Sequence, residues 1–162
     1  GELANLGIGW FEEPIEPTQD PKGLAYVAGR VSMPVAGGES GYGGTFFANL
    51  VNRGAIRIVM PDVKYCGGVA EAYRIGRSAV QTAGGISIHS PSGPVSQLAS
   101  ACVTAAIPGA MALEHAVDEA PWRAEIMEPP ERIENGRFWF PEGATAALNM
   151  DVMSLHGTTW VS

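Results

Sequence analysis

Residues 56–62 read I-R-I-V-M-P-D, a short apolar run that ends in a proline and the carboxylate of Asp62. Four other apolar runs also end at a side chain that can bind a metal or move a proton. They are W-F-E-E-P at residues 10–14 (Glu12), P-V-A-G-G-E-S at 34–40 (Glu39), I-S-I-H at 86–89 (His89) and A-M-A-L-E-H at 110–115 (Glu114). The steps between the five polar residues are 27, 23, 27 and 25 positions. A period of about 25 residues suits one strand plus one returning helix.

The segments between these runs carry helical patterns. We predict helices over residues 19–30, 44–52, 69–83 and 95–106, where apolar or small residues recur at helical spacing. Asp20 followed by Pro21 is typical of a helix start, with an N-cap residue and then proline at the first helical position. The predicted order is β-α-β-α-β-α-β-α-β, ending near Leu113. Polar groups at successive strand ends are typical of the working face of a (β/α) barrel.

Five strands cannot close a barrel that needs eight. The missing strands therefore lie on another segment or chain, or the fold is a flavodoxin-like open sheet of five strands. The polar groups on all five strand ends favour the barrel fragment. The chain begins at Gly1 without an initiator Met, so we expect it to be part of a larger protein. Residues 1–120 would form the partial barrel, and the proline-rich tail, residues 121–162, would leave it to cover another domain.

The composition limits the possible partners. The 162 residues are 46% hydrophobic and 17% charged, which is typical of a globular protein, and the net charge is −7. An acidic surface argues against nucleic acid or an anionic membrane as a partner. No apolar run approaches the ~20 residues that span a bilayer. Cys66 and Cys102 lack metal-site spacing and are interpreted as small hydrophobic residues of a cytoplasmic protein.

Glu12 and Glu39 are candidate metal ligands. They follow adjacent predicted strands, so their side chains would converge at one edge of the sheet. Hard carboxylate oxygens suit Mg²⁺, which also keeps positions for water and substrate. Two carboxylates are few for a dedicated site, so a third ligand is expected from an adjacent strand.

Asp62 and His89 are a candidate acid–base pair on the next two strand ends. A carboxylate bonded to one imidazole nitrogen fixes the tautomer and raises its basicity, which leaves the other nitrogen to move a proton. Glu114 continues the arc and could hydrogen-bond a substrate oxygen. Lys64 would point to the same face as Asp62 if the strand persists, or else be a solvated loop charge.

The ordered motifs resemble one known group of enzymes. W-F-E-E-P, G-G-E-S, M-P-D-V-K-Y-C-G-G, S-I-H-S-P and L-E-H together look like the C-terminal part of the mandelate racemase subgroup of the enolase superfamily. The likeness covers nearly the whole chain and is strongest to the acid-sugar dehydratases, whose strand-seven histidine is often followed by a P-x-G-P loop, here residues 91–94. The implied fold is strands four to eight of a (β/α)7β TIM-like barrel.

The resemblance implies a role for each candidate residue. Glu12 and Glu39 would be Mg²⁺ ligands, Asp62 and His89 an acid–base dyad, and Glu114 a contact to the substrate near its carboxylate. Ser90 and Lys64 are further candidates for substrate binding. Members of the family remove the proton alpha to the carboxylate of a 2-hydroxy acid and stabilise the resulting enediolate on the metal. Dehydratases then expel the 3-hydroxyl group to give a 2-keto-3-deoxy acid.

The chain lacks some parts of the family pattern. The N-terminal capping domain and three earlier strands, which carry a lysine base and the third metal ligand, are not in this sequence. We therefore expect the chain alone to be inactive, and the complete protein to be a Mg²⁺-dependent dehydratase and a homo-oligomer acting on a small acid sugar. The alternatives are a racemase or epimerase of a 2-hydroxy acid on the same scaffold, or a non-catalytic half-barrel that needs a partner chain.

Overall fold

Four short parallel strands form the central sheet of the computed structural model, which describes residues 5–117 and 120–156. They are β1 (Phe11–Glu12), β2 (Val35–Gly37), β3 (Ile58–Val59) and β4 (Gly85–Ile86). Ala36 of β2 pairs with Glu12 of β1 on one side and with Ile58 of β3 on the other. Since the strands are parallel, their carboxyl ends meet at one edge, where Glu12 ends β1 and Glu39, Asp62 and His89 follow β2, β3 and β4.

The strand order separates the two folds that the sequence left open. In the described part of the chain the order is β1-β2-β3-β4, so each strand pairs with the next in sequence. A flavodoxin-like sheet would instead reverse direction at a switch point, with its first strand inside the sheet. Sequential parallel pairing is the arrangement of a (β/α) barrel. The fold is the C-terminal part of a TIM-type barrel.

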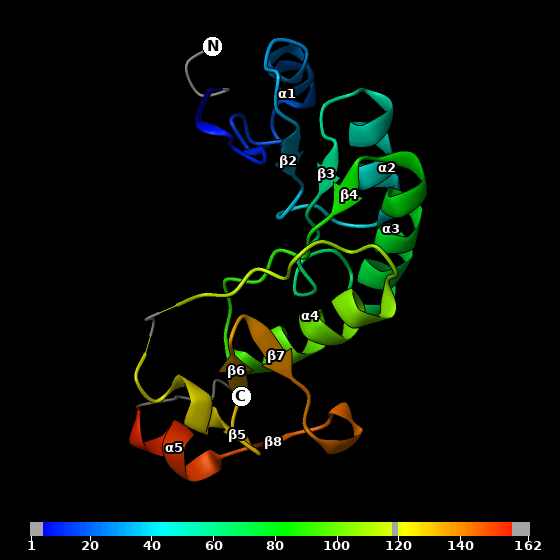
Figure 1. The fold of residues 1–162 in the computed structure, drawn as a ribbon. Coiled ribbons are helices and arrows are strands. Elements are labelled where there is room, and N and C mark those ends of the chain that lie inside the picture. The colour runs from blue at the N-terminus through cyan, green and yellow to red at the C-terminus, as the bar shows by residue number, and fades with distance from the viewer. Residues whose placement is uncertain (1–4, 118–119, 157–162) are drawn as a thin grey trace.

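The four predicted helices are confirmed, with small differences at their ends. They are α1 (Pro21–Ala28), α2 (Gly44–Asn52), α3 (Val69–Thr82) and α4 (Pro94–Ala106). The Asp20 carboxylate accepts a hydrogen bond from the backbone N–H of Gly23, as expected of an N-cap residue. Figure 1 shows α2 and α3 beside β3 and β4, while α4 begins near the C-terminal tail and runs back toward α3.

The sheet has a different apolar cluster on each face. The main core lies between sheet and helices and includes Val35, Val59 and Ile86 with Leu50 of α2 and Ile75 of α3. A second cluster consists of Ala36, Ile58 and Met60, with Trp10 and Met111 packed against it. Because side chains alternate along a strand, the second cluster lies on the face opposite the helices. In a barrel this face is the interior.

The prediction of a fifth strand near Leu113 is wrong. In the described structure residues 110–117 are extended but form no hydrogen-bonded strand. The backbone N–H of Met111 donates to the carbonyl of Ile86, and the hydroxyl of Ser87 donates to the carbonyl of Ala112. These two bonds hold the segment beside β4, but one backbone bond does not make the repeated pattern of a strand. Position in the barrel was predictable, whereas regular pairing was not.

The tail is built from short elements near α4 (Figure 1). The 3-10 helix η2 (Arg123–Ile126) is followed by β5 (Met127–Glu128), which pairs antiparallel with β8 (Ala147–Leu148). β6 (Arg132–Glu134) and β7 (Arg137–Trp139) form an antiparallel pair, and η3 (Glu142–Ala144) and α5 (Met150–Leu155) complete the described part. Arg123 is buried and lies 2.8 Å from the Glu131 carboxylate. The tail therefore has a polar anchor of its own.

Candidate active site

Asp62 and His89 lie together at the carboxyl edge of the sheet. Their backbones form an isolated parallel bridge just beyond β3 and β4. Oδ2 of Asp62 lies 3.0 Å from Nδ1 of His89. Asp62 is completely buried, and the side chain of His89 is 13% exposed. A buried carboxylate on Nδ1 favours the tautomer that carries its proton there, so that Nε2 is the nitrogen available for proton transfer.

Nε2 of His89 faces two other predicted site residues. Oε2 of Glu39 lies 3.1 Å from Nε2, and Oε2 of Glu114 lies 3.9 Å from the same nitrogen. Both glutamates are about one-third exposed, so solvent or a ligand can reach the same space. Side chains from the loops after β2 and β3 and from the segment after α4 thus converge on the imidazole of His89. Spacing alone predicted that these residues would meet.

Lys64 lies at the same site. Its ammonium group is 3.3 Å from Oδ2 of Asp62, and its backbone N–H donates to Oδ1 of the same carboxylate. The side chain is 38% exposed. The strand does not persist to Lys64, which lies in a turn, but its ammonium group still reaches the Asp62 carboxylate. Asp62 therefore bridges a cation and an imidazole.

A hydrogen-bonded chain holds Glu114 and Ser90. The backbone N–H of Ser90 donates to Oε2 of Glu114, and the Ser90 hydroxyl, which is fully buried, donates to the side-chain carbonyl of Gln97. The Gln97 amide in turn donates to the backbone carbonyl of Glu114. Sequence reasoning missed Gln97. The available signal was a lone amide in a helix of otherwise small or apolar residues, on the face that packs against the sheet.

Glu13 is a second residue that sequence reasoning missed. One oxygen of its carboxylate, Oε1, accepts hydrogen bonds from the backbone N–H groups of Gly38 and Glu39, at 2.6 and 3.2 Å. Burial raises the pKa of the Glu13 carboxyl and the nearby charge of Glu39 raises it further, whereas the two backbone bonds lower it. The signal in the sequence was the second glutamate of the E-E-P motif.

Glu12 lies on the interior face of the sheet beside Trp10. Its Oε2 accepts a hydrogen bond of 2.9 Å from the Trp10 indole, and the residue is exposed. Carboxylates on adjacent strand ends have the donor chemistry that Mg²⁺ prefers. Within residues 5–117 and 120–156, however, no group of three or more His, Cys, Asp or Glu side chains is arranged to hold a metal. Glu12 and Glu39 are thus the right type of ligand for Mg²⁺, but they would be only part of the ligand set.

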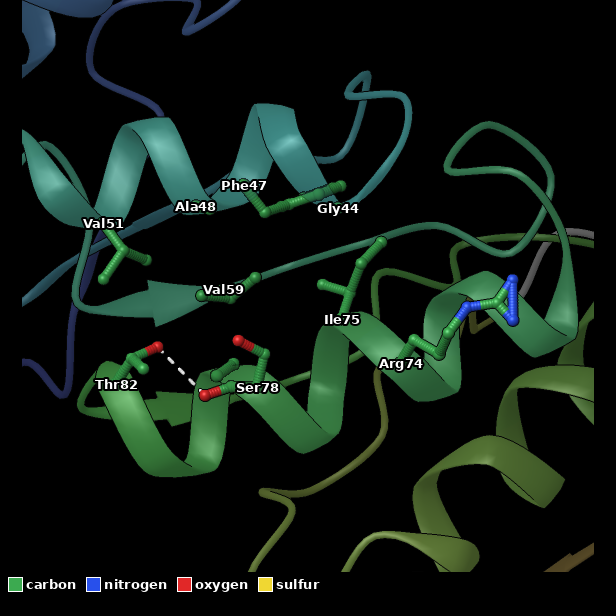
Figure 2. A pocket seen from close by; sticks show the side chains of 10 residues that line it. Gly44, Phe47, Ala48, Val51, Val59, Arg74, Ile75, Ser78 and Thr82 are labelled. Carbon is green, nitrogen blue, oxygen red and sulfur yellow. Dashed lines mark hydrogen bonds between the residues drawn. The ribbon is translucent and has the colours of Figure 1, made fainter.

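One pocket of the described structure lies away from the site. It has a volume of about 220 Å³ and separates α2 from α3, with Phe47 and Val51 on one side and Ile75 and Ser78 on the other (Figure 2). Its floor is Val59 of β3. None of the predicted site residues lines it. The candidate site is the open group of charged side chains at the strand ends.

Comparison with known proteins agrees with this geometry. The family described as "Enolase C-terminal domain-like" matches residues 1–152. The chain belongs to the enolase superfamily. In this superfamily the chain is of the mandelate racemase type. It is similar over 95% of its length to the crystal structure of a mandelate racemase/muconate lactonizing enzyme from Jannaschia sp. CCS1, with 30% identity and a TM-score of 0.82, covering 39% of that chain. A member of the enolase superfamily from Salmonella Typhimurium gives a TM-score of 0.84 at 26% identity, over 94% of this chain and 40% of the other.

Curated relatives of this superfamily chain include acid-sugar dehydratases. It is 31% identical to the D-xylonate dehydratase of Haloferax volcanii over 158 residues, which is 96% of this chain and 38% of the relative. It is 30% identical to the arabinonate dehydratase of Saccharolobus solfataricus over 86% of this chain and 37% of the relative. The chain thus spans about two fifths of the length of these relatives. No helix in the described ranges is long and apolar enough to cross a membrane.

Proposed function

We propose that the complete protein is an acid-sugar dehydratase, to which this chain contributes the acid–base dyad and two metal ligands. The observation that supports it most is the fixed position of His89, with Nδ1 on the buried Asp62 and Nε2 directed at Glu39 and Glu114. The dehydratase names of two relatives support the reaction class.

In this proposal His89 moves protons at Nε2. The substrate is a sugar acid with a hydroxyl on the carbon next to the carboxylate. His89 acts as general base toward the proton on that carbon, or as general acid toward the departing 3-hydroxyl group. Loss of the proton and of the hydroxide together removes one water and leaves an enol, which tautomerises to a 2-keto-3-deoxy acid. Asp62 stabilises the imidazolium that forms when Nε2 takes the proton.

Glu12 and Glu39 would hold Mg²⁺ at the strand ends. When bound, Mg²⁺ supplies a fixed positive charge that makes the proton next to the carboxylate more acidic. Glu114 and Lys64 flank the imidazole and would contact the substrate, the first near its carboxylate. Ser90 would help through the hydrogen bond that orients Glu114. The family resemblance implies the roles of Glu12, Glu39 and Glu114, and their positions at the strand ends support them.

We also propose that the tail, residues 121–162, packs on a capping domain and that residues 1–120 form the partial barrel. Exposed apolar side chains of the tail support this, among them Trp139 at 47% and Phe140 at 43% exposure. A surface of this kind is typical of an interface with another domain.

The test is to express the complete protein and to screen sugar acids with Mg²⁺ for 2-keto-3-deoxy products. We expect His89→Asn to lower kcat by at least about a thousandfold. His156→Asn is the matched control, because His156 stacks on Trp122 in the tail, with ring centroids 4.3 Å apart. Full turnover by His89→Asn would show that the role given to His89 is wrong.

Two further outcomes distinguish the alternatives. Exchange of the substrate's alpha hydrogen with solvent deuterium, without loss of water, would identify a racemase or epimerase. A non-catalytic half-barrel would turn over no substrate. Mixing this chain with one that carries the first three strands would then leave the Mg²⁺ affinity unchanged.

A further inference from the structure

We propose that Glu13 is a positioning residue, which fixes the direction in which Glu39 enters the candidate site. The inference rests on the proposed function, because Glu39 matters only if the strand ends form an active site. Glu13 would not touch the substrate. It would act through the backbone that carries Glu39.

The contacts of Glu13 are concentrated on one peptide segment. Its Oε1 accepts from the backbone N–H of Gly38 and from that of Glu39 itself. Its own backbone N–H donates to the carbonyl of Ala36, 3.0 Å away. The carboxyl end of β1 therefore holds β2 at one point and the segment that follows β2 at two. A rotation of the peptide between Gly38 and Glu39 would break the bond from the Glu39 N–H.

The neighbouring glycine makes room for this arrangement. A Cβ atom on Gly37 would lie 2.9 Å from Cγ and 3.0 Å from Oε1 of Glu13, closer than side-chain carbons pack. Gly37 therefore allows the Glu13 side chain to lie directly against β2. The G-G-E motif and the second glutamate of E-E-P are thus two halves of one contact.

Glu13 also adopts an unfavourable backbone conformation. Its φ is +32°, in a region that residues with a Cβ rarely occupy, and Pro14 follows it directly. Such a conformation is strained and persists when surrounding contacts require it. The contacts that require this conformation of Glu13 are its three hydrogen bonds to β2 and to the loop after β2. The strain is located at the contact that orients Glu39.

The consequence for the site is direct. The carboxylate of Glu39 lies 3.1 Å from Nε2 of His89, the nitrogen assigned to proton transfer. A displacement of about 1 Å in a catalytic group can cost a hundredfold in rate. Because Glu13 bonds to the backbone N–H of Glu39, its loss would move Glu39 relative to both His89 and any bound metal.

The test compares three variants of the complete protein. Glu13→Ala removes the acceptor, and Glu13→Gln keeps a carbonyl oxygen that can accept both N–H groups. Glu16→Ala is the matched control, because Oε1 of Glu16 also accepts a backbone N–H, from Thr18, together with the Thr18 hydroxyl. We expect Glu13→Ala to lower kcat by about 10- to 100-fold with little change in KM, Glu13→Gln to recover most of this, and Glu16→Ala to retain wild-type kcat.

Two readouts do not depend on turnover. Hydrogen exchange at the amides of Gly38 and Glu39 should accelerate in Glu13→Ala and return toward the wild-type rate in Glu13→Gln. Affinity for Mn²⁺, followed by electron paramagnetic resonance, should fall about 10- to 100-fold in Glu13→Ala. If no sugar acid is turned over, the proposed function fails but these readouts still decide the role of Glu13. The positioning role of Glu13 would be overturned if Glu13→Ala kept the wild-type exchange rate and Mn²⁺ affinity. It would also be overturned if Glu13→Ala, like Glu16→Ala, changed thermal stability alone.

Discussion

Nδ1 of His89 lies 3.0 Å from a carboxylate oxygen of Asp62, a residue 27 positions earlier in the chain and completely buried. The two residues also share a backbone bridge, so both their main chains and their side chains are held together. A side-chain contact supported by backbone pairing is rigid, which is what a proton-transfer group requires.

Replacing Asp62 with Asn should impair His89 without removing the bond geometry. The amide oxygen can still accept from His89, but the negative charge that stabilises the imidazolium is lost. We expect kcat to fall by about 10²–10⁴-fold on the best sugar acid. Steady-state kinetics of the complete protein provide the measurement. Asp20→Asn is the control, because Asn caps α1 as well as Asp does and lies away from the site; equal losses in both variants would contradict the assigned role.

Replacing Gln97 with Leu should affect both stability and activity. The change leaves the Ser90 hydroxyl and the Glu114 carbonyl without the bonds that Gln97 supplies. Since Gln97 is 1% exposed, water cannot replace them. We expect unfolding free energy to fall by about 1–3 kcal/mol in urea titrations, and kcat to fall as well. Gln81→Leu, at an exposed position of α3, should change neither. Unaltered stability in Gln97→Leu would show that the hydrogen bonds of Gln97 to Ser90 and Glu114 do not stabilise the fold.

Cys66 should resist alkylation in the native protein. Burial raises the pKa of its thiol to about 11, and the residue is fully buried. At pH 8 only about one thiol in a thousand would be ionised, and the thiolate is the reactive form. Iodoacetamide labelling in a Cys102→Ser background, followed by mass spectrometry, should leave Cys66 unmodified over a time that labels it fully in urea. Rapid native labelling would place Cys66 at an accessible position.

The carboxylate of Glu71 should give a pH-dependent stability. Its pKa lies below the usual 4.5 because the backbone N–H of Gly44 donates to it, helped by the Arg74 guanidinium. A depressed pKa means that the stabilisation is present above pH 4.5 and is lost as the pH falls through the folded-state pKa. Urea unfolding of wild type and Glu71→Gln should differ at pH 7 and converge at low pH. A difference that stays undiminished as the pH is lowered would contradict the assignment.

Much of the fold could be predicted because the local signals were strong. Asp20-Pro21 marked the start of α1, and the bounds predicted for α2 match Gly44–Asn52. The fifth strand could not be predicted correctly. The run ending at Leu113 has the apolar pattern of a strand, but a strand also needs a regularly paired neighbour. Within the described residues, this run gives β4 a single backbone hydrogen bond, from Met111.

The place of the candidate residues was predictable, but their contacts were predictable only in part, and their roles stay predictions. Near-even spacing predicted one site formed by Glu12, Glu39, Asp62, His89 and Glu114, because parallel strands end at one edge. The structure brings Glu39, Asp62 and Glu114 to His89, whereas Glu12 bonds to Trp10. The spacing could not show that the Glu39 carboxylate contacts Nε2 of His89, nor that the Gln97 amide donates a hydrogen bond to the Glu114 carbonyl. Those contacts depend on side-chain directions in the loops, which no period in the sequence encodes.

By itself the sequence determined the order of the first four strands and four helices and the edge at which chemistry could occur. It did so because apolar periodicity and chain direction fix where a buried strand ends. Only the tertiary structure decided between a barrel fragment and a flavodoxin-like sheet, through the sequential pairing of β1 to β4. It also revealed Glu13, whose two bonds to the segment after β2 join residues 25 and 26 positions apart. Contacts of that range depend on how separate elements pack, and packing is a property of the whole fold.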